Sequence, residues 1–297
     1  FGLSKEYSIG YLDSIRKNKI ASINNYIPDS TKKTKALKAL FPNHEVRKQQ
    51  LLSLRNITVD STAQTAYIKL AGFSQGSIRQ FYRNSFKAIK ELHINNLVID
   101  VRENGGGNIG LSTTLTKYVS AKPFHFADTV AAVRKNFYCS RYIHPAWLYS
   151  IIMTFTARKK NDERFHFNFL EHHVYRLKKN FHYSGNIYIV QGGFTFSAAT
   201  GFVSHLKGQP NVTVVGEETG GGYYGNSAVH LPVIKLPTTK LRITLPVYRI
   251  VTDSTRIKNG RGILPDVFVG PSSNAIRQGI DAKMQKVREL IEAGKKE

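Results

Sequence analysis

A serine at the start of a predicted helix is the first residue of this sequence that could carry chemistry. The segment GGFTFSAATG places Ser197 between a predicted strand and a predicted helix. Its hydroxyl would lie at the helix N-terminus, where the helix dipole favours an alkoxide, and the N–H of Ala198 would face the same point. Taken alone, the motif also fits a plain N-cap serine. The turn is not a GxSxG elbow, because Thr195 and Ala199 stand where that motif has glycines.

A second glycine-rich turn, DVRENGGGNIG, follows a predicted buried strand and precedes a predicted helix. Bare N–H groups of residues 105–107 would point outward there and could bind an oxyanion. The same glycines could simply form a tight turn with positive φ. A dinucleotide-binding GxGxxG is disfavoured, because Asp100 and Glu103 would meet the pyrophosphate.

Two further glycine-rich loops follow along the chain. The first, GEETGGGYYGN, occupies residues 216–226, and the second, NGRGILPDV, occupies residues 259–267. Each loop alone carries no specific chemistry.

The elements that would position these turns form two strand–helix–strand units. The spacing of apolar residues predicts strands at 66–73, 97–101, 186–190 and 212–215, and helices at 77–93 and 197–206. Such repeats predict an α/β layered core with right-handed crossovers. Residues 231–251 are expected to form antiparallel strands, and residues 274–293 one amphipathic helix. Residues 129–183 fit neither period and are interpreted as an insertion that forms a lid or wall over a site.

The composition excludes several classes of protein. Apolar residues make up 41% of the 297 residues, which is enough for a core and too many for a disordered chain. No apolar run reaches about 18 residues, so no transmembrane helix is expected. The single cysteine, Cys139, excludes an internal disulfide framework. The net charge of +23 would attract acidic partners, but its cations are scattered, and no specific nucleic-acid site is predicted.

Taken in order, the four motifs resemble the S41 family of serine peptidases, which includes C-terminal processing and tricorn-like peptidases. The matching pieces are DVRENGGG, FTFSAATGF, GEETGGG and GRGILPDV. The resemblance implies a crotonase-like β/α spiral core over residues 61–297, preceded at 1–60 by the end of a PDZ-like module and a linker. It also implies a polypeptide substrate, no cofactor or metal, and an extracytoplasmic setting such as the bacterial periplasm or cell envelope. The oligomeric state is left open.

Within this resemblance, Ser197 is the nucleophile of an endopeptidase that works through an acyl-enzyme. The oxyanion hole is formed by the N–H of Ala198 and that of Gly106, with Gly107 as the alternative donor. Glu217 and Asn259 are candidate orienting residues.

The group that activates the serine departs from the family pattern. The lysine of the processing peptidases falls by spacing on Gly222, and the glutamate of the tricorn-like branch falls on Asn259. His205 and His230 are the histidine candidates, but packing and surface roles are preferred for them. The general base is therefore expected upstream of Phe1. The alternative is a non-catalytic, peptide-binding relative that has lost the chemistry.

Overall fold

The computed structural model describes residues 53–74, 76–137, 140–143 and 146–294. The chain divides into two units, Phe1–Leu54 and Arg55–Glu297, and the description below concerns the second. The PDZ-like module expected at 1–60 lies almost wholly outside the described residues. The main sheet already begins at Arg55, so residues 55–60 belong to a strand of the core.

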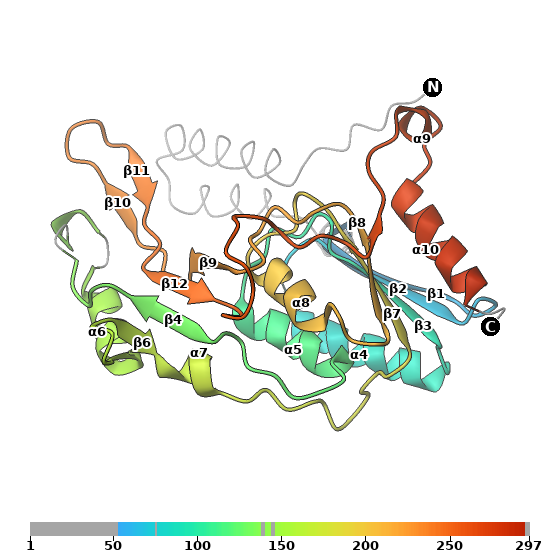
Figure 1. The fold of residues 1–297 in the computed structure, drawn as a ribbon, viewed down its shortest axis with the longest axis horizontal. Helices are drawn as coiled ribbons and strands as arrows, with labels where there is room; N and C mark the ends of the chain where they lie inside the picture. The colour runs from blue at the N-terminus through green and yellow to red at the C-terminus, as the bar shows by residue number, and fades with distance from the viewer. Residues whose placement is uncertain (1–52, 75, 138–139, 144–145, 295–297) are drawn as a thin grey trace, which may run out of the picture. The chain divides into compact units, whose positions relative to one another are not determined.

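A six-stranded sheet, with strand order β1-β2-β3-β7-β8-β13, forms the centre of this unit (Figure 1). β1 is antiparallel to β2, and every other neighbouring pair is parallel. The strands are β1 (Arg55–Asp60), β2 (Thr65–Leu70), β3 (Asn96–Asp100), β7 (Asn186–Gln191), β8 (Val212–Gly216) and β13 (Val267–Phe268). The four strands predicted from the sequence are confirmed to within a few residues.

Helices cover both faces of this sheet. α4 (Ile78–Glu91), α5 (Ile109–Val119) and α8 (Ala198–Leu206) pack on one face through a large apolar core, which includes Phe73, Phe86 and Phe202. α10 (Ala282–Ala293) packs on the other face through Val287 and Ile291. Because both faces are covered, every residue of β3 is buried, as a parallel strand between two layers requires.

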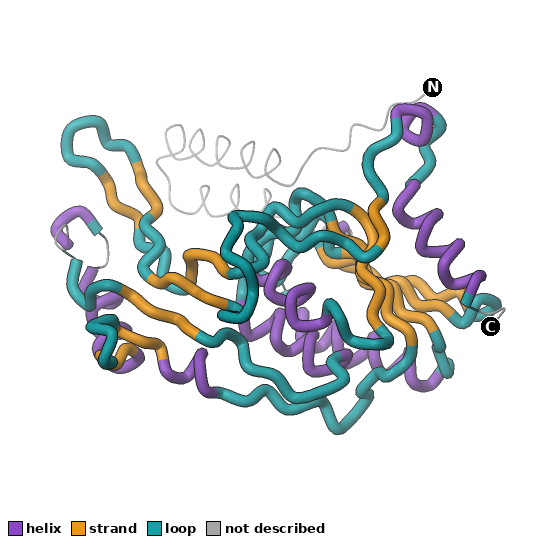
Figure 2. The backbone as a smooth tube through the Cα atoms, in the orientation of Figure 1, coloured by secondary structure: helices purple, strands orange, loops and turns teal. Residues whose placement is uncertain are grey.

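A second sheet has the order β5-β6-β4-β12-β9 and is antiparallel (Figure 2). Its strands are β4 (Thr129–Ala132), β5 (Ala157–Lys159), β6 (Phe165–Phe167), β9 (Gly225–Ala228) and β12 (Tyr248–Val251). The short helix η1 (Ser140–Tyr142), with α6 (Ala146–Thr156) and α7 (Asn168–His172), lies between these strands in sequence. A separate hairpin contains β10 (Val233–Lys235) and β11 (Arg242–Thr244). Residues 129–183 fit neither period because their strands are only three or four residues long.

The prediction of one continuous helix at 274–293 is wrong. The structure has two helices there, α9 (Ser273–Arg277) and α10. Gly279 takes a φ of +67°, a left-handed conformation that ends a helix. Asp281 then begins the next helix, because its side chain accepts a hydrogen bond from the N–H of Met284 at 3.2 Å.

The architecture is a mixed α/β fold, as the strand–helix–strand pattern predicts. None of the helices in the described part of the chain is long and apolar enough to cross a membrane.

Candidate active site

Ser197 occupies a strained turn between β7 and α8. Its φ is +51° and its ψ is −119°, a backbone conformation that residues other than glycine rarely adopt. It stands at the N-cap position of α8, but its side chain makes no capping hydrogen bond. Within the described residues its hydroxyl has no hydrogen-bond partner, and the residue is half-buried. The plain N-cap interpretation therefore does not explain this serine.

Gly106 lies directly against this turn. A Cβ on Gly106 would sit 2.8 Å from the Cβ of Ser197 and 3.0 Å from the nitrogen of Ala198. The φ of Gly106 is +100°, so only glycine fits here on both counts. The backbone N–H of Phe196 also donates to the carbonyl of Asn104 at 3.1 Å. The structure thus brings the DVRENGGG turn and the serine turn into contact.

The N–H groups available to an oxyanion differ from the pair that the sequence analysis preferred, Ala198 and Gly106. The N–H of Gly106 donates to Oδ1 of Asn104 at 2.9 Å, so this donor is already used. The N–H groups of Gly107 and Ala198 have no acceptor among the residues that the structure describes. Of the two glycines, Gly107 is therefore the one whose N–H remains available as a second donor beside that of Ala198.

Asn104 is a site residue that the sequence reasoning missed. Its side chain is fully buried and holds the N–H two residues further on, which is the usual local bond of an Asx turn. An asparagine two positions before a glycine was the feature that could have revealed it. Its Nδ2 has no partner within the described chain.

The two remaining glycine-rich loops complete the surroundings of Ser197. The N–H of Gly221 donates to the carbonyl of Thr195 at 3.0 Å, and a Cβ on Gly221 would lie 3.2 Å from the nitrogen of Ser197. The hydroxyl of Thr219 accepts from the N–H of Ile263 at 2.7 Å, which joins this loop to the GRGILPDV segment.

Gln191, at the end of β7, holds the same two loops. Its Nε2 donates to the carbonyl of Glu217 at 2.8 Å and to that of Ile263 at 2.7 Å. All four sequence motifs therefore meet at one end of the main sheet.

The two candidate orienting residues are engaged elsewhere. Glu217 forms an ion pair with Lys283 at 2.5 Å. Asn259 is exposed, and its Oδ1 accepts from the N–H of Arg261 at 3.0 Å. Neither side chain makes a hydrogen bond with Ser197. Gly222, where the family's processing branch has lysine, forms an isolated antiparallel bridge with Gly262.

The two candidate histidines lie in packed surroundings. His205 contacts the carbonyl of Gly201 at 2.5 Å and that of His125 at 2.8 Å through its two ring nitrogens. Burial lowers the pKa of His205 despite these bonds. This agrees with the packing role that we expected for it.

His230 is also held away from the serine. It lies among three aromatic rings, those of Tyr149, Phe167 and Tyr248. Its Nδ1 is buried without a partner in the described region, and burial lowers its pKa. His230 is therefore a packed residue, where a surface position was expected.

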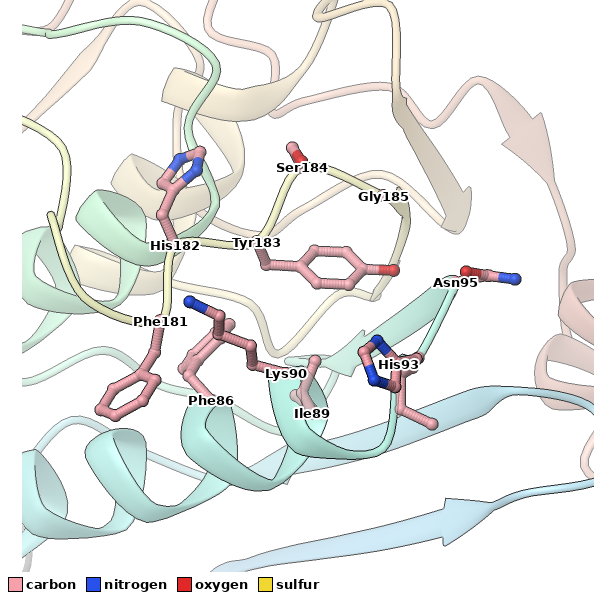
Figure 3. A pocket seen from close by; sticks show the side chains of 11 residues that line it. Phe86, Ile89, Lys90, His93, Asn95, Phe181, His182, Tyr183, Ser184 and Gly185 are labelled. Carbon is pink, nitrogen blue, oxygen red and sulfur yellow. The ribbon is translucent and has the colours of Figure 1, made fainter.

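A pocket of about 380 Å³ lies at the opposite end of the main sheet (Figure 3). Its lining includes Lys90, His93 and Asn95, just before β3, and Tyr183 and Gly185, just before β7. Ser197 follows the carboxyl end of β7. Because the strands are parallel, the length of the sheet separates this pocket from the serine. Among the described residues, no cluster of three or more histidine, cysteine or acidic side chains is arranged to hold a metal.

Comparison with known proteins places this geometry in a family. The model of peptidase family S41 matches residues 64–269. A candidate peptidase from Parabacteroides merdae ATCC 43184 has a similar structure, with a TM-score of 0.52 and 18% identity over 80% of this chain and 64% of that one. Mature CPAF in complex with lactacystin has a TM-score of 0.55 and 12% identity over 76% of this chain and 51% of that one.

These structural likenesses, at such low identity, show the fold. The chain spans about half to two thirds of the length of these relatives. No curated protein sequence matches it. The family model covers more than half of the chain, including all four motifs, and the chain belongs to peptidase family S41.

Proposed function

We propose that this chain is the catalytic core of a serine endopeptidase with Ser197 as its nucleophile. The observation that carries the proposal is the serine turn itself. Within the described chain, a hydroxyl without a hydrogen bond stands at the N-terminus of α8, at a φ of +51°, next to the N–H of Ala198, which has no acceptor there, and against the glycine turn that contains Gly107. A protein gains nothing in stability from such strain, which is typical of functional sites.

The proposed reaction begins with attack of the Ser197 oxygen on the carbonyl carbon of a peptide bond. The N–H groups of Ala198 and Gly107 stabilise the oxyanion that forms. The serine proton passes to a general base and then to the departing amine, which leaves an acyl-enzyme. Water hydrolyses this ester, and the serine regains its proton. No group in the described residues is hydrogen-bonded to the hydroxyl of Ser197, so the proposal assigns the base to none of them.

Three finer features belong to this proposal and rest on the family resemblance. They are a crotonase-like spiral topology for the core, a PDZ-like module within residues 1–60, and an extracytoplasmic setting. The substrate would be a polypeptide bound in extended form along a strand edge.

The test compares the chain with Ser197→Ala and with a control, Ser227→Ala, which changes the exposed residue of strand β9. A fluorophosphonate probe should label the chain and the control but not Ser197→Ala. Cleavage of an unfolded protein substrate should fall at least about 10³-fold in Ser197→Ala only, because the nucleophile is removed. Thermal unfolding should move little, since the lost hydroxyl makes no bond. Equal labelling of all three proteins would refute the assignment.

A second candidate is a non-catalytic, peptide-binding relative. It is favoured by the engagement of Glu217 with Lys283 and by Gly222 at the place of the family's lysine. Binding of an unfolded protein without labelling or cleavage would select this alternative.

A further inference from the structure

The helix α6 turns its apolar side chains outward. Its sequence, AWLYSIIMTFT, contains no charge, and only Met153 is buried. Trp147, Leu148, Ile151 and Phe155 are exposed by 66%, 40%, 46% and 76%. Their spacing of one, three and four residues places them on one face of the helix. An apolar face of this kind marks an interaction site.

Cations flank this face. Between residues 129 and 183 the chain has ten Lys or Arg against three Asp or Glu. All three acids are engaged locally: Asp162 with His166, Glu163 with Lys159, and Glu171 with Lys160 and His166. Arg141 and Arg158 are exposed at either end of α6, on the elements η1 and β5 that contact it. The face therefore combines aromatic and aliphatic groups with a positive border.

The hairpin β10–β11 also combines exposed apolar side chains with cations. An antiparallel bridge between Ile143 and Ile234 ties it to the segment before α6. Leu241 and Ile243 are exposed by 61% and 48%. The hairpin residues 231–246 contain three cations, Lys235, Lys240 and Arg242, and no acid.

We propose that the exposed face of α6, with its flanking cations, docks this protein on an anionic lipid bilayer. Tryptophan and phenylalanine beside Lys and Arg are typical of helices that lie in the membrane interface. An 11-residue helix is too short to span a bilayer, so it would lie in the plane of the headgroups. The cations would be drawn to the negative leaflet surface.

Two other occupants fit less well. A second copy of the chain would bring two positive borders and two net charges of +23 together, which repel. Single-stranded nucleic acid would suit the cations and could stack on Trp147 and Phe155. It would leave Leu148 and Ile151 without a partner, since bases stack on aromatic rings.

The test uses the fact that Trp147 is the only tryptophan in the chain. The probe is a vesicle of phosphatidylcholine with about one third phosphatidylglycerol, set against vesicles of phosphatidylcholine alone. We expect the anionic vesicles, and not the neutral ones, to shift Trp147 emission to the blue, protect it from acrylamide and sediment the protein. Salt should weaken the binding.

Variants locate the binding face while keeping Trp147 as the reporter. Ile151→Ser with Phe155→Ser should lower vesicle affinity at least about ten-fold, since both apolar contacts are lost. Removal of the charge of either Arg141 or Arg158 should lower vesicle affinity about five-fold. The matched control is Phe268→Ser with Ile276→Ser, which are exposed by 73% and 70% on β13 and α9 and should bind as the parent does. Circular dichroism checks that each variant is folded.

Four results would overturn the proposal. Sedimentation with vesicles while Trp147 emission stays constant would place the contact elsewhere. An equal loss of vesicle affinity in the control pair would show that the binding does not depend on α6. A blue shift that depends on protein concentration without lipid would indicate a second copy. A response to single-stranded RNA and none to anionic vesicles would indicate nucleic acid.

Discussion

The core on the six-stranded sheet and the helix α6 use large apolar side chains in opposite ways. In that core, Phe73, Phe86 and Phe202 are fully buried. In the region of the second sheet, Trp147 and Phe155 face outward. Burial of an aromatic side chain stabilises the fold, whereas several large apolar side chains exposed together on one helix face mark a contact surface. The first region is built to hold a strained turn in place, and the second is built to present a surface.

The largest expected effect tests this contrast directly with two phenylalanines. Phe202→Ala removes a fully buried ring from α8 and should lower the free energy of unfolding by about 3–5 kcal/mol. Phe155→Ala removes an exposed ring and should change it by less than about 0.5 kcal/mol. Urea unfolding measures both. Similar losses in the two variants would show that Phe155 is packed in solution, and the contrast would be lost.

A smaller effect is expected from the glycines that hold the serine turn. Gly106→Ala should lower the free energy of unfolding by about 2–3 kcal/mol, because its φ of +100° and its contact with Ser197 both exclude a side chain. Peptidase activity should fall as well. Gly105→Ala is the matched control, since no atom lies within 4 Å of its added Cβ. Calorimetry and the cleavage assay are the measurements, and equal tolerance of both alanines would contradict the packing described.

The smallest effect concerns a buried carboxylate of the second region. Burial would raise the pKa of Glu171, but bonds from Lys160, the N–H of Val130 and His166, each 2.7 Å long, lower it overall. The ionised form therefore stabilises the fold above the unfolded pKa of about 4.3, and this contribution is lost as the pH falls through the lower folded value.

Glu171→Gln should accordingly cost about 1–2 kcal/mol at neutral pH and progressively less below about pH 4. Unfolding of both proteins in urea at several pH values measures the difference. A gap that stays constant down to pH 2 would mean that the charge of Glu171 contributes nothing. The exposed α6 should be unaffected, so vesicle binding of the variant at neutral pH serves as a control.

Four of the six strands of the main sheet could be predicted, because they and the helices between them are long enough to show a period. The other two could not, since β1 lies in the stretch expected to be a linker and β13 has only two residues. β3 is apolar from Leu97 to Ile99, and α4 has 14 residues with a clear buried face. In the second sheet only β12 could be predicted, since it lies with the hairpin β10–β11 within the antiparallel strands expected at 231–251. The strands of residues 129–183 could not, because three or four residues show no alternation. The break in the C-terminal helix depends on the left-handed Gly279, and a glycine within a helical pattern does not by itself announce that conformation.

The segments that form the site could be predicted from the sequence, but the hydrogen-bond and ion-pair partners of their residues could not. The four motifs identified the region around Ser197, and the structure brings them together. The choice between Gly106 and Gly107 depends on a single bond from Gly106 to Asn104, and motif spacing does not reveal which N–H is already taken. Whether Glu217 faces the serine depends on Lys283, which lies 66 residues further along the chain.

The tight packing at Gly222 limits how this chain could be redesigned. A Cβ at this position would lie 2.6 Å from the carbonyl oxygen of Gly225, closer than real side chains approach a backbone atom. Grafting a lysine there would therefore require the turn at residues 223–225 to move first. A designer who wants a serine–lysine pair must remodel the backbone of that turn before changing the side chain.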